Sequence, residues 1–221
     1  MKKMILITLM IAVLLTSGAF AEEKQQDMKF NVAARYYPAT LKISNAPDYT
    51  IGAIWLEGNL FVGKDSRWKG SIEWIKGNDT KTVTGVSTKI DNCQLIGRIG
   101  YDVWEKLYLG LDYKSNKMDI SPTGFGTVSR TFRGLGIGAE KHFDLSKDWP
   151  AFAAIHYYPT LTGPGSLNFR AFEYEAGIMY RWPKAVDISV GYRGETWCGY
   201  DNASNTNINF SGPYIGISKE F

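Results

Sequence analysis

Apolar and polar residues alternate with a period of two along most of the chain after residue 27. The clearest stretch is 172–182, with the sequence FEYEAGIMYRW. In it Phe172, Ile178 and Trp182 belong to an apolar set, and Glu175 and Arg181 belong to the residues between them. This period is that of a β-strand with one apolar and one polar face. The stretch predicts a strand, but it leaves open which solvent each face meets.

Nine other segments carry a similar pattern, so we predict an all-β chain of about ten strands. The predicted strands are 28–42, 49–62, 67–77, 88–101, 105–115, 130–143, 150–161, 172–182, 186–197 and 208–221. Eight or twelve strands stay open as alternatives, because strand ends and weak strands are what a single sequence determines least well.

The connections between these segments alternate in length. Those at 63–66, 102–104, 144–149 and 183–185 are short, and two others are short to medium, 43–48 and 162–168. The remaining three, 78–87, 116–129 and 198–207, are longer and rich in Asn, Thr, Ser and Gly. Short periplasmic turns, longer outer loops and an even strand number are typical of outer-membrane barrels. The pattern predicts an antiparallel up-and-down transmembrane β-barrel, and its longer loops are the candidate binding surface.

Aromatic residues on the apolar faces gather near the strand ends. The candidate girdles are Trp68, Tyr101, Phe143, Tyr180 and Trp182 on the turn side and Trp74, Tyr113, Tyr157, Phe172 and Tyr192 on the loop side. Two girdles around an aliphatic band are expected where a barrel crosses the two bilayer interfaces. The apolar faces are therefore expected to meet lipid. A secreted lipocalin-like carrier with an apolar interior is the soluble alternative.

The chain ends in GPYIGISKEF, which places Ile215, Ile217 and Phe221 on one face. This ending resembles the C-terminal strand of bacterial outer-membrane β-barrel proteins, in which a terminal aromatic residue is part of the signal read by the barrel-assembly machinery. The resemblance implies Phe221 as the assembly signal, and lipid and lipopolysaccharide as the surroundings. Lys219 departs from the pattern, since an apolar residue is common there, but a lysine at the rim can keep its charged end in water.

Residues 1–21 have the pattern of a secretory signal peptide. Lys2 and Lys3 precede an apolar run, 4–15, that is too short for a spanning helix, and Ala19-Phe20-Ala21 fits a cleavage site. We expect residues 22–221 to form one barrel domain in the outer membrane of a Gram-negative-type bacterium. Without the two lysines, 23 basic residues stand against 22 acidic ones, with no charge block that indicates nucleic-acid binding.

Charged residues lie mid-strand on the parity opposite to the apolar faces. They form a candidate lumen charge network of Arg35, Glu57, Glu73, Arg98, Asp112, Glu140, His156, Glu173, Glu175, Arg181, Asp187, Arg193 and Glu195. A barrel of this size is filled by side chains or leaves at most a narrow passage. The expected function is envelope-structural, surface-interaction or small-solute pore, with a narrow or closed lumen.

The 183–185 turn gives a register that coordinates can test. If Trp182 faces Val186, the facing pairs are Arg181 with Asp187, Glu175 with Arg193, and Glu173 with Glu195. A similar interpretation of the first hairpin places Arg35 opposite Glu57. Such cross-strand pairs of opposite charge help to fix register.

An outer-membrane lipid-modifying enzyme using His156 is the catalytic alternative. Glu173 or Glu175 could be its cross-strand neighbour and orient its imidazole. However, Ser189 lies at the opposite end of its strand, and Ser71 lies several strands away. The chain also has no metal-ligand spacing, Gly-rich phosphate loop or nucleophile elbow. We therefore expect no enzyme activity, no catalytic residue and no cofactor or metal.

Two smaller features follow from the same strand assignment. Glycines at 134, 136 and 138 occupy every second position of one strand, which suits a crowded lumen. Cys93 and Cys198 lie on the fourth and ninth predicted strands, on opposite sides of a ten-strand barrel. Free thiols are therefore expected rather than a disulfide.

Overall fold

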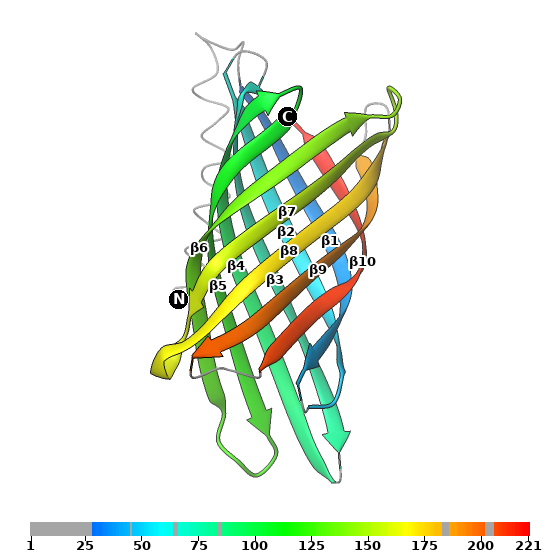
Figure 1. The fold of residues 1–221 in the computed structure, drawn as a ribbon. Helices are drawn as coiled ribbons and strands as arrows, with labels where there is room; N and C mark the ends of the chain where they lie inside the picture. Colours follow the sequence, from blue (N-terminus) through cyan, green and yellow to red (C-terminus); the bar gives the residue numbers. More distant parts are fainter. Residues whose placement is uncertain (1–27, 45, 64–65, 84, 183–185, 202–205) are drawn as a thin grey trace, which may run out of the picture.

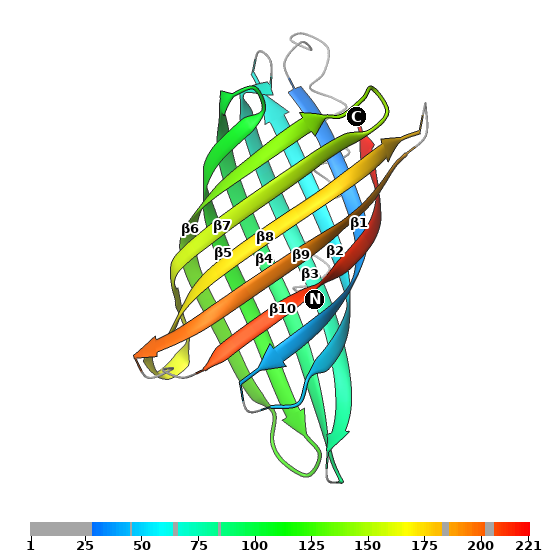
Figure 2. The same ribbon diagram turned by 45° about the vertical axis from the view of Figure 1, so that its right-hand side comes forward.

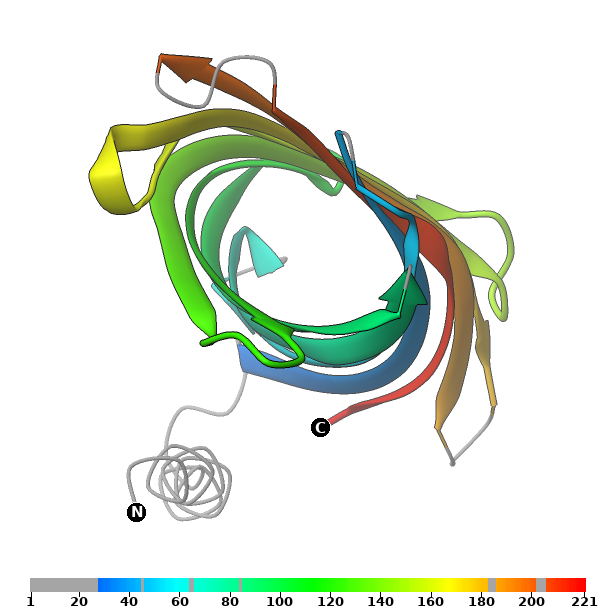
Figure 3. The ribbon, with the colours of Figure 1, turned by 90° about the horizontal axis from the view of Figure 1, so that it is seen from below.

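The computed structural model describes residues 28–44, 46–63, 66–83, 85–182, 186–201 and 206–221. Within them, ten antiparallel strands form a closed up-and-down barrel, in which β1 pairs with β10 and every other pair is consecutive in the chain (Figure 1). The closed ring is visible along the barrel axis in Figure 3. The predicted fold is confirmed. The predicted signal peptide, 1–21, lies outside the described residues.

The strands are β1 (Met28–Ile43), β2 (Tyr49–Val62), β3 (Trp68–Val83), β4 (Val86–Trp104), β5 (Leu107–Pro122), β6 (Val128–Asp144), β7 (Pro150–Thr162), β8 (Leu167–Arg181), β9 (Asp187–Asp201) and β10 (Asn207–Glu220). A single 3-10 turn, η2 (Pro164–Ser166), separates β7 from β8. Among the described residues, no helix has the length and apolar character needed to cross a membrane.

Several strands extend into segments that the sequence pattern assigns to loops. β3 and β4 continue to Val83 and from Val86, and β5 and β6 continue to Pro122 and from Val128, so much of 78–87 and 116–129 is strand. β8 begins earlier than predicted, at Leu167, and β9 ends later than predicted, at Asp201. Thr, Val and Ile residues in 80–90 favour strand. These strand extensions have no apolar face, but strands that lie outside the lipid can pair without one. Figures 1 and 2 show the β3–β4 and β5–β6 hairpins extending past the other strands.

The two ends of the barrel differ in their connections. We call the end with the connections 63–67, 105–106, 145–149 and 182–186 the turn end, and the opposite end the loop end. In outer-membrane barrels the short turns are periplasmic and the longer loops face outward.

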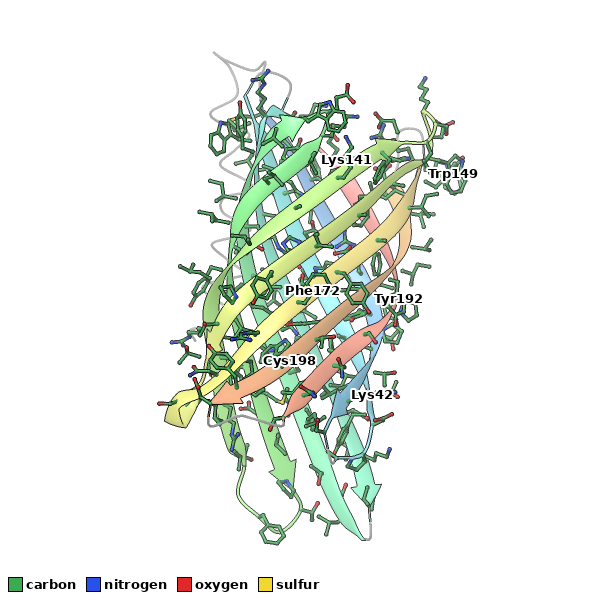
Figure 4. The ribbon with its side chains drawn as sticks, in the orientation of Figure 1. Lys42, Lys141, Trp149, Phe172, Tyr192 and Cys198 are labelled. Carbon is green, nitrogen blue, oxygen red and sulfur yellow. The ribbon has the colours of Figure 1, made fainter. Side chains whose placement is uncertain are left out.

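Large apolar side chains cover the outside of the barrel between the two ends. This apolar belt includes Tyr36, Ile54, Leu60, Ile72, Ile99, Leu111, Leu135, Ile137, Ile155, Val190, Ile215 and Ile217, all exposed. Figure 4 shows Phe172 and Tyr192 on the same outer surface. Monomeric soluble proteins rarely expose so much contiguous apolar surface. The belt therefore faces lipid, and the lipocalin-like carrier is not supported.

Aromatic rings border this belt. Trp68 contacts Tyr101 with ring centroids 4.9 Å apart, and Trp149 contacts Tyr180 at 4.8 Å, both near the turn end. Toward the loop end, Tyr192 stacks on Tyr174. Trp149 and Tyr174 are absent from the predicted girdles. Trp149 lies in a connection rather than a strand, which hid it from the alternation pattern.

The two ends of the chain close the barrel. The backbone N–H of Phe221 donates a 2.8 Å hydrogen bond to the carbonyl of Phe30, and the N–H of Phe30 donates one of 3.3 Å in return. Phe221 lies just beyond β10, and its side chain stays exposed on the outside. The last residue of the chain is thus part of the β1–β10 seam.

Candidate functional site: the barrel interior

The interior has three layers between the turn end and the loop end. A polar cavity lies on the turn side, a network of charged residues lies in the middle, and packed apolar side chains fill the loop side. The cavity and the network share residues. On most strands the inward positions become apolar toward the loop end, while β4 and β5 also keep the buried amides Asn92 and Asn116 there.

The loop-side layer, which we call the apolar plug, consists of side chains from all ten strands. Its members include Tyr37, Leu41, Ile51, Ile75, Ile90, Met118, Phe132, Tyr158, Leu161, Phe169, Trp197 and Phe210, all buried. Phe132, Phe169 and Trp197 make edge or tilted ring contacts with one another at 5.3–5.6 Å. Close packing of this kind leaves few voids larger than a water molecule. The plug therefore fills the lumen in its outer half.

Glu173 on β8 lies at the centre of the charge network. Its carboxylate accepts hydrogen bonds from Arg193 at 2.7 Å and from Lys114 at 2.9 Å, and it also pairs with Arg98. Arg193 bonds in turn to Glu73 on β3 at 2.8 Å. The network therefore joins β3, β4, β5, β8 and β9 across the lumen, and only fully partnered charges are tolerated at such burial.

Two acidic residues of the network face each other directly, because Glu173 pairs in register with Glu195. Like charges directly opposite on neighbouring strands destabilise a sheet. Here the ammonium group of Lys114, which is fully buried, forms ion pairs with both carboxylates. Lys114 thus converts a repulsive pair into an attractive three-residue group.

Trp55 separates the charge network from the apolar plug. Its fully buried ring lies 4.1 Å from the guanidinium carbon of Arg35 and 4.5 Å from that of Arg193. Cation–π contacts of this kind strengthen when the site excludes water. The same ring contacts Tyr214 and Tyr37 on its apolar side. One side chain therefore belongs to both layers.

His156 contacts a carboxylate other than the predicted ones. Its cross-strand neighbour is Glu173, as the parity argument allowed, but its Nδ1 lies 2.7 Å from the Oδ2 of Asp112 on β5. The side chain reaches past β6 because Gly138 has no side chain there: a Cβ atom on it would lie 2.1 Å from the Nδ1 of His156 and 3.0 Å from the Oδ2 of Asp112. Among the described residues, the structure gives His156 no hydrogen bond to a hydroxyl or thiol. The imidazole therefore has an orienting group but no adjacent nucleophile.

The glycine stripe on β6 makes room for the larger groups around it. A Cβ atom on Gly138 would lie 2.1 Å from the Nδ1 of His156, and one on Gly136 would lie 2.6 Å from the ring of Tyr158. The two glycines therefore allow His156 and Tyr158 to cross the lumen. The expectation of a crowded lumen at this strand is met.

Replacing Gly138 with alanine is expected to destabilise the folded barrel by about 1–3 kcal/mol, because the methyl group displaces the His156 ring. Urea unfolding in detergent micelles, followed by tryptophan fluorescence, measures the change. Gly97→Ala is the matched control, since a Cβ atom there meets nothing within 4 Å. Equal unfolding midpoints for the two variants would contradict the assigned role of Gly138.

A polar cavity of about 150 Å³ occupies the turn half of the lumen. Its lining reaches from network residues such as Arg98 and His156 to rim residues such as Asp187 and Glu220. Within it Lys69 pairs with Glu140, which also bonds to His142 at 2.5 Å. Most of the charged side chains that line the cavity on the network side form ion pairs with one another. No group of three or more metal-binding side chains occurs among the described residues.

All thirteen predicted network residues lie in strands of the barrel, and the structure links most of them. The predicted β8–β9 register is the observed one, with Arg181 opposite Asp187, Glu175 opposite Arg193, and Glu173 opposite Glu195. The predicted pairing of Arg35 opposite Glu57 is wrong: Arg35 faces Trp55. The two charges still form an ion pair, diagonally, because a shift of two residues keeps both side chains inside.

The sequence prediction of the charge network omitted some interior residues. Lys69 and Lys114 are buried ion-pair partners, and Gln94 donates a 3.3 Å hydrogen bond to Glu195. All three lie on the same face of their strand as a predicted network member. That shared parity could have identified them from the sequence. Cys93 and Cys198 are free thiols on β4 and β9.

Comparisons with known proteins give fold-level similarity. No family model and no curated protein sequence matches the chain. Among solved structures, the chain is similar to the attachment invasion locus protein Ail of Yersinia pestis, at 10% identity over 89% of this chain and 100% of that one, with a TM-score of 0.46. Neisserial surface protein A aligns at 12% identity over 88% and 97% of the two chains, TM-score 0.46.

The outer membrane protease OmpT of Escherichia coli aligns at 11% identity over 88% of this chain and 94% of that one, with a TM-score of 0.49. All three similarities have a TM-score below 0.5 and at most 12% identity, so they carry no functional conclusion. The outer-membrane location rests on the closed barrel and its apolar belt, which together describe an integral outer-membrane protein.

Proposed function

We propose that this protein is a closed, non-conducting outer-membrane barrel that acts in envelope structure or surface interaction rather than in solute passage. The observation that carries the proposal is the apolar plug, whose largest members, including Tyr37, Leu41 and Tyr158, are fully buried. A hydrated ion would need to replace its shell with polar groups, and the aliphatic and aromatic side chains of the plug supply only a few hydroxyls.

The interaction surface in this proposal is the pair of hairpins that extend beyond the loop end. Val83 and Val86 are exposed on the β3–β4 hairpin, and Phe125 and Val128 are exposed on the β5–β6 hairpin. Exposed apolar residues at the tips of rigid strands suit contact with another macromolecule. The charge network would then serve to hold the barrel in one register beneath this surface.

We also propose that the β10 strand, with Phe221 at its end, is read by the barrel-assembly machinery during insertion. The exposed Phe221 side chain and the seam with Phe30 support this role. We do not propose catalysis at His156. Its imidazole is oriented by Asp112, but no nucleophile contacts it in the part of the chain that the structure describes.

Recordings in planar bilayers test the closed barrel. The refolded wild-type protein is expected to give no discrete current steps, because the plug and the charge network both block the lumen. The same refolded protein is inserted into vesicles and treated with protease, and resistance of its strands verifies insertion. A porin added to a parallel bilayer verifies that the recording detects open channels. Reproducible unit conductance from the inserted protein would overturn the proposal.

A further inference from the structure

Three basic residues gather on the outside of β3, β5 and β6, immediately beyond the apolar belt. Trp74, Tyr113 and Leu135 are the last apolar residues facing outward on these strands before the loop end. Lys76, Lys117 and Arg133 follow them on the same face, and all three are exposed. We call these three residues the outer basic cluster. Their position corresponds to the headgroup level of the outer leaflet.

The strand register brings the cluster together. Lys76 faces Cys93, and Cys93 faces Lys117, so the two lysines lie on one row two strands apart. Arg133 faces Ser115, which precedes Lys117 by two residues, so Arg133 is the diagonal neighbour of Lys117. Neighbouring strands are about 4.8 Å apart and diagonal neighbours about 7–8 Å. The long basic side chains can therefore converge over the small residues Cys93 and Ser115.

The cluster carries more positive charge than its neighbours neutralise. Asp91 and Asp119 face each other one row closer to the loop end. Lys89 pairs with Asp91 at 2.9 Å, and Lys117 pairs with Asp119 at 2.6 Å. In the described structure neither Lys76 nor Arg133 forms an ion pair. Like charges at adjacent positions of a sheet repel. A bound anion would therefore reduce the repulsion among these basic side chains in the free protein.

The turn end lacks an equivalent cluster among its described residues. On its strands the outward-facing lysines are Lys141 on β6 and Lys219 on β10, on separate parts of the barrel, and the exposed Lys106 in the β4–β5 turn pairs with Asp144. The ammonium of Lys141 lies 5.5 Å from the centre of the Trp104 ring, and that of Lys219 lies 5.4 Å from the Phe221 ring. Figure 4 shows Lys141 near the turn end. The concentration of unpaired positive charge is therefore a feature of the loop end.

We propose that the outer basic cluster binds the phosphate groups of lipopolysaccharide in the outer leaflet. Phosphate is the anion that guanidinium and ammonium groups bind best through charge-assisted hydrogen bonds. The cluster borders lipid rather than open water, so its ligand is a membrane lipid with phosphate at the outer interface. The proposal rests on the proposed orientation, in which the loop end faces outward.

Binding of lipid A to the detergent-purified barrel, counted by native mass spectrometry, tests the site. The variant with both Lys76→Gln and Arg133→Gln is compared with the wild type, and Lys219→Gln is the matched control at the opposite rim. We expect the double variant to bind phosphorylated lipid A about a hundredfold more weakly, since two charge-assisted hydrogen bonds are lost and each is worth about a decade in Kd. The control variant is expected to bind like the wild type.

Two further arms identify the ligand. Lipid A without phosphates is expected to bind the wild type and the double variant equally weakly, and inorganic phosphate alone is expected to leave the melting temperature unchanged. Equal binding of phosphorylated lipid A to the wild type and the double variant would overturn the site. Stabilisation by inorganic phosphate that the double variant loses would overturn the lipid as ligand. Neither result depends on conductance, so the closed barrel is tested separately.

Discussion

Replacing Glu173 with alanine is expected to lower the free energy of unfolding by about 3–5 kcal/mol, because three buried cations each lose one of their carboxylate partners. Glu173 is 1% exposed and binds Arg98, Lys114 and Arg193 at once. Equilibrium urea unfolding in lipid vesicles, followed by tryptophan fluorescence, measures the loss. If the variant does not refold, the fraction of protease-resistant barrel after refolding reports the same effect.

The control for this variant is Glu220→Ala at the turn end, where the side chain is half exposed and pairs with Lys29 at 3.5 Å. Exposed ion pairs contribute between about 0 and 1 kcal/mol. A loss for Glu173→Ala no larger than that for Glu220→Ala would show that the network does not hold the barrel together.

Replacing Ile137 with arginine is expected to cost about 2–4 kcal/mol, the range for a basic residue at the bilayer midplane on the lipid face of a barrel. Ile137 is 59% exposed on β6, and its neighbours on the same outer row are Leu111 and Tyr157. The exposure of Ile137 marks contact with lipid rather than with water. Unfolding in vesicles gives the magnitude.

Thr131→Arg is the matched control on the same strand and the same face. Thr131 lies beyond the apolar belt, where the cost of a basic residue falls to between about 0 and 1 kcal/mol. The difference between the two variants measures where the membrane ends along β6. If both variants unfold at the same urea concentration, the assigned lipid face of β6 is wrong.

Much of the fold follows from the period-two pattern alone. Parity separated Glu175 and Arg181 from Tyr174 and Tyr180, and the structure has the first pair inside and the second outside. The β8–β9 register could be predicted because the 183–185 turn is short, so few pairings join Arg181 to Asp187. The predicted connection 43–48 is longer than 183–185, and the number of its residues that belong to strand could not be determined from sequence. The pairing of Arg35 was consequently two positions out.

The interior of the barrel was predicted less completely than its strands and their faces. The search for charged residues identified the network, but Trp55 and Trp197, which share the parity of Glu57 and Glu195, were not assigned to the lumen. Parity states which face a side chain is on, but not how far along the barrel axis the polar interior ends. That limit depends on strand tilt, which the sequence does not show. The apolar plug and the contact between His156 and Asp112 could therefore be identified only from the structure.

The seam between Phe30 and Phe221 has a consequence for how the barrel is made. It joins β1 to β10, the two strands farthest apart in the chain, so the ring cannot close until β10 has been synthesised and exported. Until then both strands have unpaired edges, which are open to mispairing and aggregation. Pairing so distant in sequence also carries the largest loop-closure entropy in the molecule and slows folding. The exported chain therefore has a vulnerable period in the periplasm, which a chaperone that covers β1 and β10 would shorten.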